Sequence, residues 1–418
     1  MPKAIDDFCQ FISASPTAFH AADQIGNRLA LLGFDPLEGS KKWPLKNGGR
    51  YFWEKGGSLI AFTLPKKKAE RAHIVASHLD SPALKVKPQG LTTKDTLAFL
   101  STEIYGGPIL ETYLNRPLTL AGKVMGMTQS GKLESRLIAL DESPFILPAM
   151  PPHLKAKETP KKQRQCQALV HVTDKDLTWD ELLNTAHYFT EIVSFDLFLT
   201  PTAAPTYLGP HAELLAAPRL DNLSSAYGAI AGLTNSEPLD DVIQIAYFSN
   251  HEEIGSRTSQ GAASPHLMHT LERIALAQNI SREELLCLIE KSICLSLDVA
   301  HGYHPFFGEH FDPEHKCLLG KGVVIKEHAG KRYHTDSVMT AHLKMWGKHL
   351  QRFASNSDSP CGGTIGPIIA SELGIATADL GCPVLSMHAA MEIMAPRDLL
   401  DLCHLVKSFL NDESTCPL

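Results

Sequence analysis

The stretch 241–256, DVIQIAYFSNHEEIGS, joins a nearly continuous apolar run to two adjacent glutamates, Glu252 and Glu253. An apolar run without alternation is typical of a strand buried on both faces, as in a parallel sheet. On an extended chain, neighbouring side chains point to opposite faces. The stretch is therefore either a solvated acidic turn after a buried strand, or part of a site in which the two glutamates have different roles.

The sequence around this stretch alternates between strand-like and helix-like segments. Other short apolar runs predict strands at 72–78, 292–298, 322–328 and 376–388. Apolar residues at helical spacing predict helices at 222–233, 266–278, 282–291, 336–354 and 396–410. Strands that alternate with helices are characteristic of α/β proteins. We therefore expect an α/β fold whose mainly parallel sheet is covered by helices on both faces.

The segment 88–212 has a different sequence pattern. Its β-like stretches are short and separated by turns and prolines, and they lie at Leu118–Met127, Leu133–Leu140, Ala168–Thr173 and Ile192–Leu199. A chain of 418 residues more often forms two domains than one. We expect an inserted β-rich domain at 88–212 that interrupts a catalytic domain made of 1–87 and 213–418.

Composition narrows the class of protein. The formal charge is 39 − 46 = −7, which argues against nucleic acid or an anionic membrane as the main partner. No apolar run approaches the roughly 20 residues that span a bilayer, and the start of the sequence lacks the apolar core of a secretory signal. The nine cysteines are scattered and include no C-x-x-C pair, which favours reduced thiols. We expect a cytoplasmic protein.

Histidines and carboxylates follow the apolar runs: His78, Asp221, Glu252, Glu253, Asp298 and His388. Ligands of open parallel sheets gather at the carboxyl ends of the strands, where these residues can converge. Imidazole and carboxylate suit zinc and related divalent ions, and the lack of cysteine ligands argues against a purely structural zinc site. A pair of such ions needs a bridging carboxylate. The pattern predicts a two-metal hydrolytic site.

Two local details support that prediction. Asp80 lies two residues after His78, on the same side of an extended segment, where a carboxylate can orient an imidazole that binds metal. Of the adjacent glutamates 252 and 253, one can bind metal while the other takes a proton from water.

Each residue alone has a simpler explanation. A histidine at a strand end is usually a hydrogen-bonded core or loop residue, and Asp221 alone is most simply a helix N-cap. Asp298 and the two glutamates could be solvated turn acids. Their joint placement favours the metal site, and the sequence has no serine nucleophile elbow, phosphate-binding loop or dinucleotide motif as an alternative.

Eight motifs occur in the order found in one family: ASHLDSPALKVKP, EIYGG, RLDNL, NHEEIGS, SLDVAHGYHP, GVVIKEHAGKRYHTDS, CGGTIGPI and LGCPVLSMHAAMEI. The chain resembles the M18 metallopeptidases, the aspartyl aminopeptidases, from about residue 16 to 412. The resemblance implies two divalent ions, most simply Zn²⁺, with Co²⁺ or Mn²⁺ as alternatives. It assigns one ion to His78 and Asp298, the other to Glu253 and His388, and the bridge to Asp221.

The resemblance also assigns Glu252 as general base and Asp80 as the orienting acid. It implies removal of an N-terminal residue, preferably Asp or Glu, from peptides, with Lys326 meeting the acidic side chain. A strand-edge lysine pointing to water is the simpler alternative. His153, in ILPAMPPHL, matches a histidine that reaches a neighbouring subunit's site, unless it is only a loop residue. The family assembles as a tetrahedral dodecamer with an internal chamber.

Some positions depart from the family pattern, namely Pro108, the trio Asn115-Arg116-Pro117, His334 and Met391. None is a proposed metal ligand, but together they leave the strictness of the acidic preference open. The prediction is a dinuclear zinc aminopeptidase acting on peptides with a free N-terminus. Its rivals are a related metallo-aminopeptidase that prefers neutral N-terminal residues, and a non-catalytic assembly or cargo-binding shell with the same fold.

Overall fold

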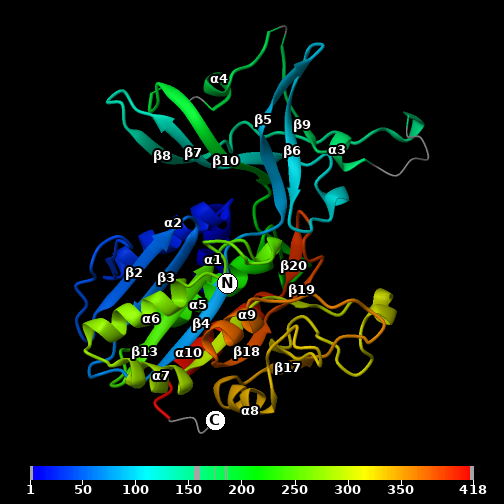
Figure 1. Ribbon diagram of the computed structural model, residues 1–418. Coiled ribbons are helices and arrows are strands. Elements are labelled where there is room, and N and C mark those ends of the chain that lie inside the picture. Colours follow the sequence, from blue (N-terminus) through cyan, green and yellow to red (C-terminus); the bar gives the residue numbers. More distant parts are fainter. Residues whose placement is uncertain (1–2, 155–160, 174, 184, 186, 415–418) are drawn as a thin grey trace.

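The computed structural model describes residues 3–154, 161–173, 175–183, 185 and 187–414. Figure 1 shows two parts: a large body of helices and strands, and a smaller β-rich part that stands on it. Residues far apart in the chain form the body, because the β-rich part is inserted between β4 and the segment that begins with β11. This arrangement confirms the predicted α/β class.

A nine-stranded mixed sheet forms the centre of the body. Its spatial order is β1 (Asp35–Pro36), β2 (Arg50–Lys55), β3 (Ser58–Thr63), β13 (Val242–Ser249), β4 (Arg71–His78), β14 (Ile293–Leu297), β18 (Ala376–Gly381), β16 (Val323–Lys326) and β17 (Leu350–Phe353). The four central strands, β13, β4, β14 and β18, are parallel, whereas β3 and β16 join them in antiparallel pairs. The carboxyl ends of the four central strands therefore open on one edge of the sheet.

Helices cover both faces of this sheet, as the sequence pattern predicted. Five share one hydrophobic core with the sheet: α1 (Lys3–Ser13), α2 (Ala18–Leu31), α5 (Leu220–Thr234), α8 (Ser337–Trp346) and α10 (Pro396–Leu410). Three pack on the opposite face: α6 (His266–Ala277), α7 (Arg282–Glu290) and α9 (Gly366–Leu373). Their apolar stripes are buried against the fully buried strands, which places most of the hydrophobic stabilisation in two layers.

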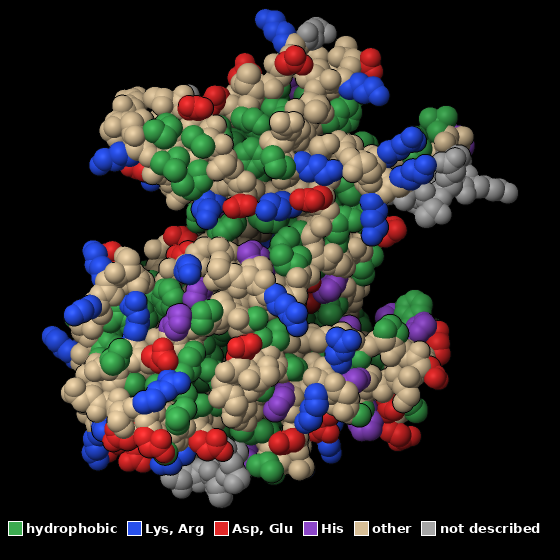
Figure 2. All heavy atoms as spheres, viewed as in Figure 1, with side chains coloured by type: hydrophobic (Ala, Val, Ile, Leu, Met, Phe, Trp, Pro, Cys, Tyr) green, Lys and Arg blue, Asp and Glu red, His purple; other side chains and the backbone are tan. Residues whose placement is uncertain are grey.

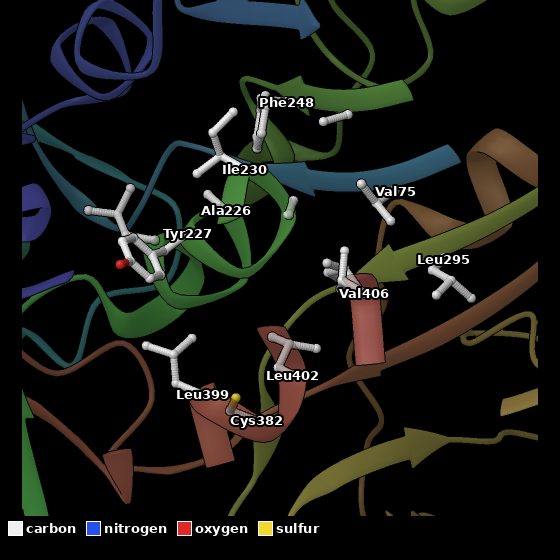
Figure 3. Packing of buried hydrophobic residues seen from close by; sticks show 14 of the residues in the cluster. Val75, Ala226, Tyr227, Ile230, Phe248, Leu295, Cys382, Leu399, Leu402 and Val406 are labelled. Carbon is white, nitrogen blue, oxygen red and sulfur yellow. The ribbon is translucent and has the colours of Figure 1, made fainter. Parts of the chain in front are cut away.

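Helices α5 and α10 pack on each other, and Figure 3 shows Tyr227 and Ile230 of α5 in the same buried cluster as Leu399, Leu402 and Val406 of α10. The two helices approach closely because α5 carries glycine where a Cβ would collide with the side chain of Val406. α5 in turn covers β4 and β13. Its N-terminal end is thereby fixed over the carboxyl ends of the central strands.

Two smaller sheets complete the fold. The inserted part is a six-stranded antiparallel sheet in the order β8 (Leu133–Ala139), β7 (Leu118–Met127), β10 (Glu191–Pro201), β5 (Ala83–Lys94), β6 (Leu97–Tyr105) and β9 (Gln167–Val172), with α3 (Lys162–Gln165) and α4 (Trp179–Leu183) beside it. The other sheet has the order β11 (Thr206–Leu208), β12 (Leu214–Ala217), β20 (Glu392–Met394), β19 (Pro383–Leu385) and β15 (Ala300–His301). Short 3₁₀ turns lie at Leu110–Thr112, Pro152–Leu154, Glu252–Ile254 and Pro305–His310.

Most of the predicted elements match the structure, but the helix predicted at 336–354 is wrong in its second half. α8 ends at Trp346, where Gly347 adopts an extended conformation, and 350–353 forms β17. The apolar spacing continues past the glycine, but pairing with β16 decides the conformation. Strand β5 was not predicted and begins at Ala83, inside the range 1–87 assigned to the catalytic domain.

The buried imidazole of His73 in β4 makes stability depend on pH. It is 3% exposed and stacks on Phe409, and its burial beside Arg71 lowers the pKa of His73 to about 4. The unfolded chain therefore binds the proton at higher pH than the folded chain, so this contribution to stability is lost as pH falls from about 6.5 towards 4.

When the pH is lowered from 7.5 to 5, the free energy of unfolding should fall in both proteins. We expect the fall to be about 2 kcal/mol smaller in His73→Leu than in the wild type. Urea denaturation at the two pH values measures the difference. His269→Leu, which removes an exposed histidine from α6, is the matched control and should keep the wild-type pH dependence. Equal pH dependence in His73→Leu and the wild type would contradict the prediction.

Candidate metal centre

Three neighbouring strands of the central sheet end in polar residues at one edge. His78 is the last residue of β4, Asp298 follows β14 directly, and Glu252 and Glu253 follow β13. Because β13, β4 and β14 are adjacent and parallel, these side chains converge at the edge where open sheets bind ligands. All four residues line a single cavity of about 290 Å³.

Asp221 and His388 reach the same cavity from the five-stranded sheet. Asp221 lies at the start of α5, just after β12, and His388 lies in the turn between β19 and β20. Asp221 does not cap the helix, because no backbone N–H of the described residues donates to its carboxylate, and its buried Oδ1 has no hydrogen-bond partner among them. Its carboxylate is instead directed at the two histidines.

The Asp221 carboxylate lies between the two imidazoles. Its Oδ1 is 3.4 Å from His78 Nε2, and its Oδ2 is 3.3 Å from His388 Nε2. Asp298 Oδ1 lies 3.9 Å from His78 Nε2, and Glu253 Oε2 lies 3.6 Å from His388 Nε2. Two compact ligand groups result, and they share Asp221.

Main-chain carbonyls fix the orientation of both imidazoles. His78 Nδ1 is 3.0 Å from the carbonyl oxygen of Asp80, and His388 Nδ1 is 3.0 Å from that of Gly107. A carbonyl only accepts, so each Nδ1 carries the hydrogen and donates it. Each Nε2 is therefore the ring nitrogen that faces the carboxylates, and it is the atom that would bind a metal ion.

The donor set fits divalent ions. Asp221 Oδ1 and Glu253 Oε1 are buried and accept no hydrogen bond within the described part of the chain. Buried acceptors without a donor are costly, and a cation between them would remove that cost. Two imidazoles with four carboxylates are ligands that zinc, cobalt and manganese accept.

Crowding of carboxylates shows in their pKa values. Burial, together with the nearby Asp298 and Asp221 carboxylates, raises the pKa of Glu252 to about 7. Burial and Asp221 raise the pKa of Glu253 well above its ordinary value. Burial lowers the pKa of His388, but Asp221 outweighs it and raises that pKa to about 9. The site holds more negative charge than its surroundings neutralise, which favours cation binding.

The prediction that Glu252 and Glu253 point to opposite faces of an extended segment is wrong. The pair does not lie on an extended segment but in a 3₁₀ turn, between His251 and Gly255 in left-handed conformations. Both carboxylates line the same cavity, and both belong to a ligand group with His78. Their surroundings differ instead, because Glu253 Oε2 lies 3.6 Å from His388 Nε2, whereas Glu252 forms no ion pair within 4 Å among the described residues.

Asp80 lies beside His78, where the sequence places it, and it also supports the site through a second set of contacts. Its carboxylate is 3.5 Å from His78 Nδ1, whereas its own main-chain oxygen is nearer. The carboxylate accepts hydrogen bonds from the backbone N–H groups of Glu252 (3.0 Å) and Glu253 (3.1 Å) and from the hydroxyl of Tyr105 (2.8 Å). Asp80 therefore fixes the turn that carries the two glutamates.

Three supporting residues were not singled out from the sequence. Asn222 is buried and donates to Leu297 O and Ser77 Oγ, which ties the start of α5 to β14 and β4. Tyr105 donates to Asp80, and Glu392 accepts from two ligand-bearing segments. Burial and the Asp221 carboxylate raise the pKa of Glu392 to about 8. A polar residue within an apolar run, such as Asn222, is the one local signal that could have pointed to them.

Lys326 lines the cavity from β16. It is 3% exposed, donates to Val299 O at 3.0 Å, lies 3.8 Å from Asp298 Oδ2 and faces the ring of Tyr333 at 5.0 Å. It is thus not directed into bulk water. A second cavity of about 460 Å³ adjoins the first and shares His301, Phe353 and Met387 in its lining.

His153 does not reach this cavity in its own chain. It lies in the exposed turn Pro152–Leu154 of the inserted part and is absent from the residues that line either cavity. The departures from the family pattern also do not line the metal-site cavity: Pro108, Asn115, Arg116, Pro117, His334 and Met391.

Comparisons with known proteins agree with this geometry. Residues 11–410 match the family described as Aminopeptidase I zinc metalloprotease (M18). The chain belongs to the M18 family. It is 35% identical to a probable M18 family aminopeptidase 2 of Streptomyces avermitilis over 97% of both chains. It is 33% identical to the protein of the same description in Mycobacterium leprae, over 98% of this chain and 99% of that one.

Solved structures extend the match to three dimensions. A chain in the cryo-EM structure of the Ape4 and Nbr1 complex superimposes with a TM-score of 0.91 at 30% identity, covering 98% of this chain and 85% of that chain. The S. cerevisiae mApe1 dodecamer gives a TM-score of 0.87 at 25% identity, covering 97% and 96%. This M18 protein is therefore a metallo-aminopeptidase. None of the helices in the described ranges is long and apolar enough to cross a membrane.

Proposed function

We propose that this M18 aminopeptidase uses two zinc ions to remove N-terminal Asp or Glu from peptides. The shared position of Asp221, with one carboxylate oxygen near each imidazole, is the observation that carries the proposal. His78 and Asp298 would hold one ion, Glu253 and His388 the other, and Asp221 both. When bound, such a pair polarises a carbonyl and acidifies water.

Glu252 is the residue we assign as general base. It lines the cavity beside the other carboxylates but is not assigned to either ion, which leaves its carboxylate to take and return a proton. In the proposed reaction Glu252 accepts a proton from the attacking water and passes it to the leaving amine. Asp80 holds the backbone of Glu252 in place through its N–H group.

Glu252→Gln tests this role. We expect kcat to fall by about 10² to 10⁴, because the amide cannot accept the proton. Two zinc ions per chain should remain bound, measured by metal analysis of the protein used for kinetics. Glu253→Gln is the contrasting variant, since it should lose metal as well as activity.

Unchanged kcat in zinc-loaded Glu252→Gln would rule out this base. Wild-type protein that binds two ions but hydrolyses no peptide in a broad panel would support the non-catalytic shell instead.

Lys326 supports the preference for acidic residues. Its ammonium group is buried at the cavity wall and donates to one carbonyl, which leaves donors for a carboxylate of the substrate. A charge-assisted bond in a buried cavity is strong and selective. Since none of the six departing residues lines this cavity, they give no reason to expect a neutral preference.

In Lys326→Met we expect the ratio of kcat/KM for Asp- over Leu-peptides to fall about 10- to 100-fold, the effect of losing one bond to a charged group. Otherwise identical peptides provide the assay. Lys321→Met, an exposed lysine before β16, is the control and should keep the ratio. A wild-type enzyme that prefers Leu-peptides would establish the neutral alternative.

The inserted domain at 88–212 is proposed to form the contacts of a tetrahedral dodecamer. Figure 2 shows apolar side chains gathered on the visible face of this domain. Its exposed large apolar residues include Leu133, Leu137, Val172 and Val193. Exposed apolar clusters of this kind mark interaction surfaces. The exposed His153 is assigned to the active site of a neighbouring subunit, where it would bond the developing oxyanion.

Each chain has a mass of 45.7 kDa. We therefore expect sedimentation velocity to give about twelve times this mass. His153→Ala should keep that mass while kcat falls by about 10² to 10³, the loss seen when one oxyanion donor is removed. His187→Ala, elsewhere in the inserted domain, serves as the control. A fully active monomer would refute both the assembly and the role of His153.

We also propose that the protein is cytoplasmic. Eight cysteines lie in the described part of the chain, and all are free thiols, as expected in a reducing compartment. Fractionation of the native cells tests the location.

A further inference from the structure

Glu392 lies between two segments that carry metal ligands. It is the first residue of β20, the middle strand of the five-stranded sheet. On one side β20 pairs with β12, which leads into Asp221, and Glu392 is directly opposite Ala217. On the other side β20 pairs with β19, which leads into the turn that carries His388.

Both carboxylate oxygens of Glu392 hold backbone groups of these ligands. Oε2 accepts from the N–H of Asp221 at 2.9 Å, and Oε1 accepts from the N–H of His388 at 2.7 Å. The side chain is 1% exposed, so water does not replace either bond. The Glu392 carboxylate thus joins Asp221, which is 171 positions away in the chain, to His388, which is four positions away.

The backbone at these ligands needs such support. His388 adopts a left-handed conformation with φ of +68°, which is unfavourable for a residue with a Cβ. Asp221 lies in a non-helical stretch at the start of α5. Neither N–H takes part in a regular helix or strand bond, and a buried N–H without an acceptor is costly. Glu392 supplies both acceptors from one side chain.

Glu392 has a counterpart on the other side of the site. Asp80 accepts from the N–H groups of Glu252 and Glu253 in the same two-oxygen manner. Between them, the two buried carboxylates fix the backbone of four of the six residues assigned to metal binding and catalysis. Asp80 was singled out from the sequence, whereas Glu392 has no assigned role.

We propose that Glu392 is a positioning residue that sets the spacing between the Asp221 and His388 ligands through two backbone hydrogen bonds, and so determines how tightly the site binds metal. The proposal rests on the proposed function, since it assumes that these residues bind metal. Glu392 touches neither substrate nor reacting atoms. Its effect passes entirely through the backbone of the two ligands.

The chain offers a matched control in Asp398 of α10. This carboxylate is 0% exposed and accepts from two backbone N–H groups, those of Gly320 at 2.7 Å and Gly322 at 2.8 Å. It makes the same pair of bonds, but neither glycine is a ligand and Asp398 does not line the metal-site cavity. Replacing Asp398 therefore removes the same pair of carboxylate–backbone hydrogen bonds without altering the proposed metal ligands.

The test compares Glu392→Gln and Asp398→Asn in the full chain after removal of metal by a chelator. Each amide keeps one acceptor and presents an NH₂ group to the second N–H. Zn²⁺ affinity is measured by competition with a chromophoric chelator. The visible absorption spectrum of Co²⁺-loaded protein reports ligand geometry. Thermal unfolding of metal-free protein reports the structural cost of each variant.

We expect both variants to lower the melting temperature of the metal-free chain. Only Glu392→Gln should weaken Zn²⁺ binding, about 10- to 100-fold as for other residues that support metal ligands, and alter the Co²⁺ spectrum. Wild-type Zn²⁺ affinity in Glu392→Gln, or equal weakening in both variants, would overturn the proposal. Failure of the wild-type chain to bind two ions would instead contradict the proposed function.

Discussion

An excess of buried negative charge is the constraint on which the site depends. Asp80, Asp221, Glu252, Glu253, Asp298 and Glu392 surround two imidazoles, and Lys326 is the one Lys or Arg that lines the metal-site cavity within the described residues. Such a cluster repels itself strongly where water is excluded. The structure manages it by separating the carboxylates into two kinds. Asp80 and Glu392 each accept from two backbone N–H groups, while Asp221 and Glu253 keep buried oxygens without donors. The first kind stabilises the fold, and the second favours a cation.

The central sheet is the frame that holds these carboxylates close together. Parallel strands β13, β4 and β14 are buried on both faces, so their ends form a rigid edge from which side chains converge. Asn222 then connects the start of α5 to two of those strands. The ligands come from segments spread over the chain, but each is held by short local contacts. Rigidity of this kind is what a site of two ions requires.

Much of this could be predicted from the sequence, and the reasons for the successes and failures differ. Apolar runs ending in His78, Asp298 or Glu252 place these residues at strand ends, because burial sets the run and the sheet sets the direction. Glu392 could not be found in that way, since its role exists only once β12, β19 and β20 pair. The helix predicted over 350–353 failed for a similar reason, because pairing with β16 outweighs local spacing. The family motifs imply a ligand set, but they do not indicate the contacts that hold these residues in place.

The inserted part completes the site of the body below it. Tyr105, the last residue of β6, donates to Asp80, and the carbonyl of Gly107 just after β6 accepts from His388. Both contacts come from the β-rich part, which is made before most of the body. The residues proposed as metal ligands run from His78 to His388, a separation of 388 − 78 = 310 residues. During synthesis, the ligand set is therefore incomplete until residue 388 has left the ribosome and both parts have docked. With this ligand assignment, a growing chain lacks the assembled metal site that it would need to attack its own or its neighbours' free ends.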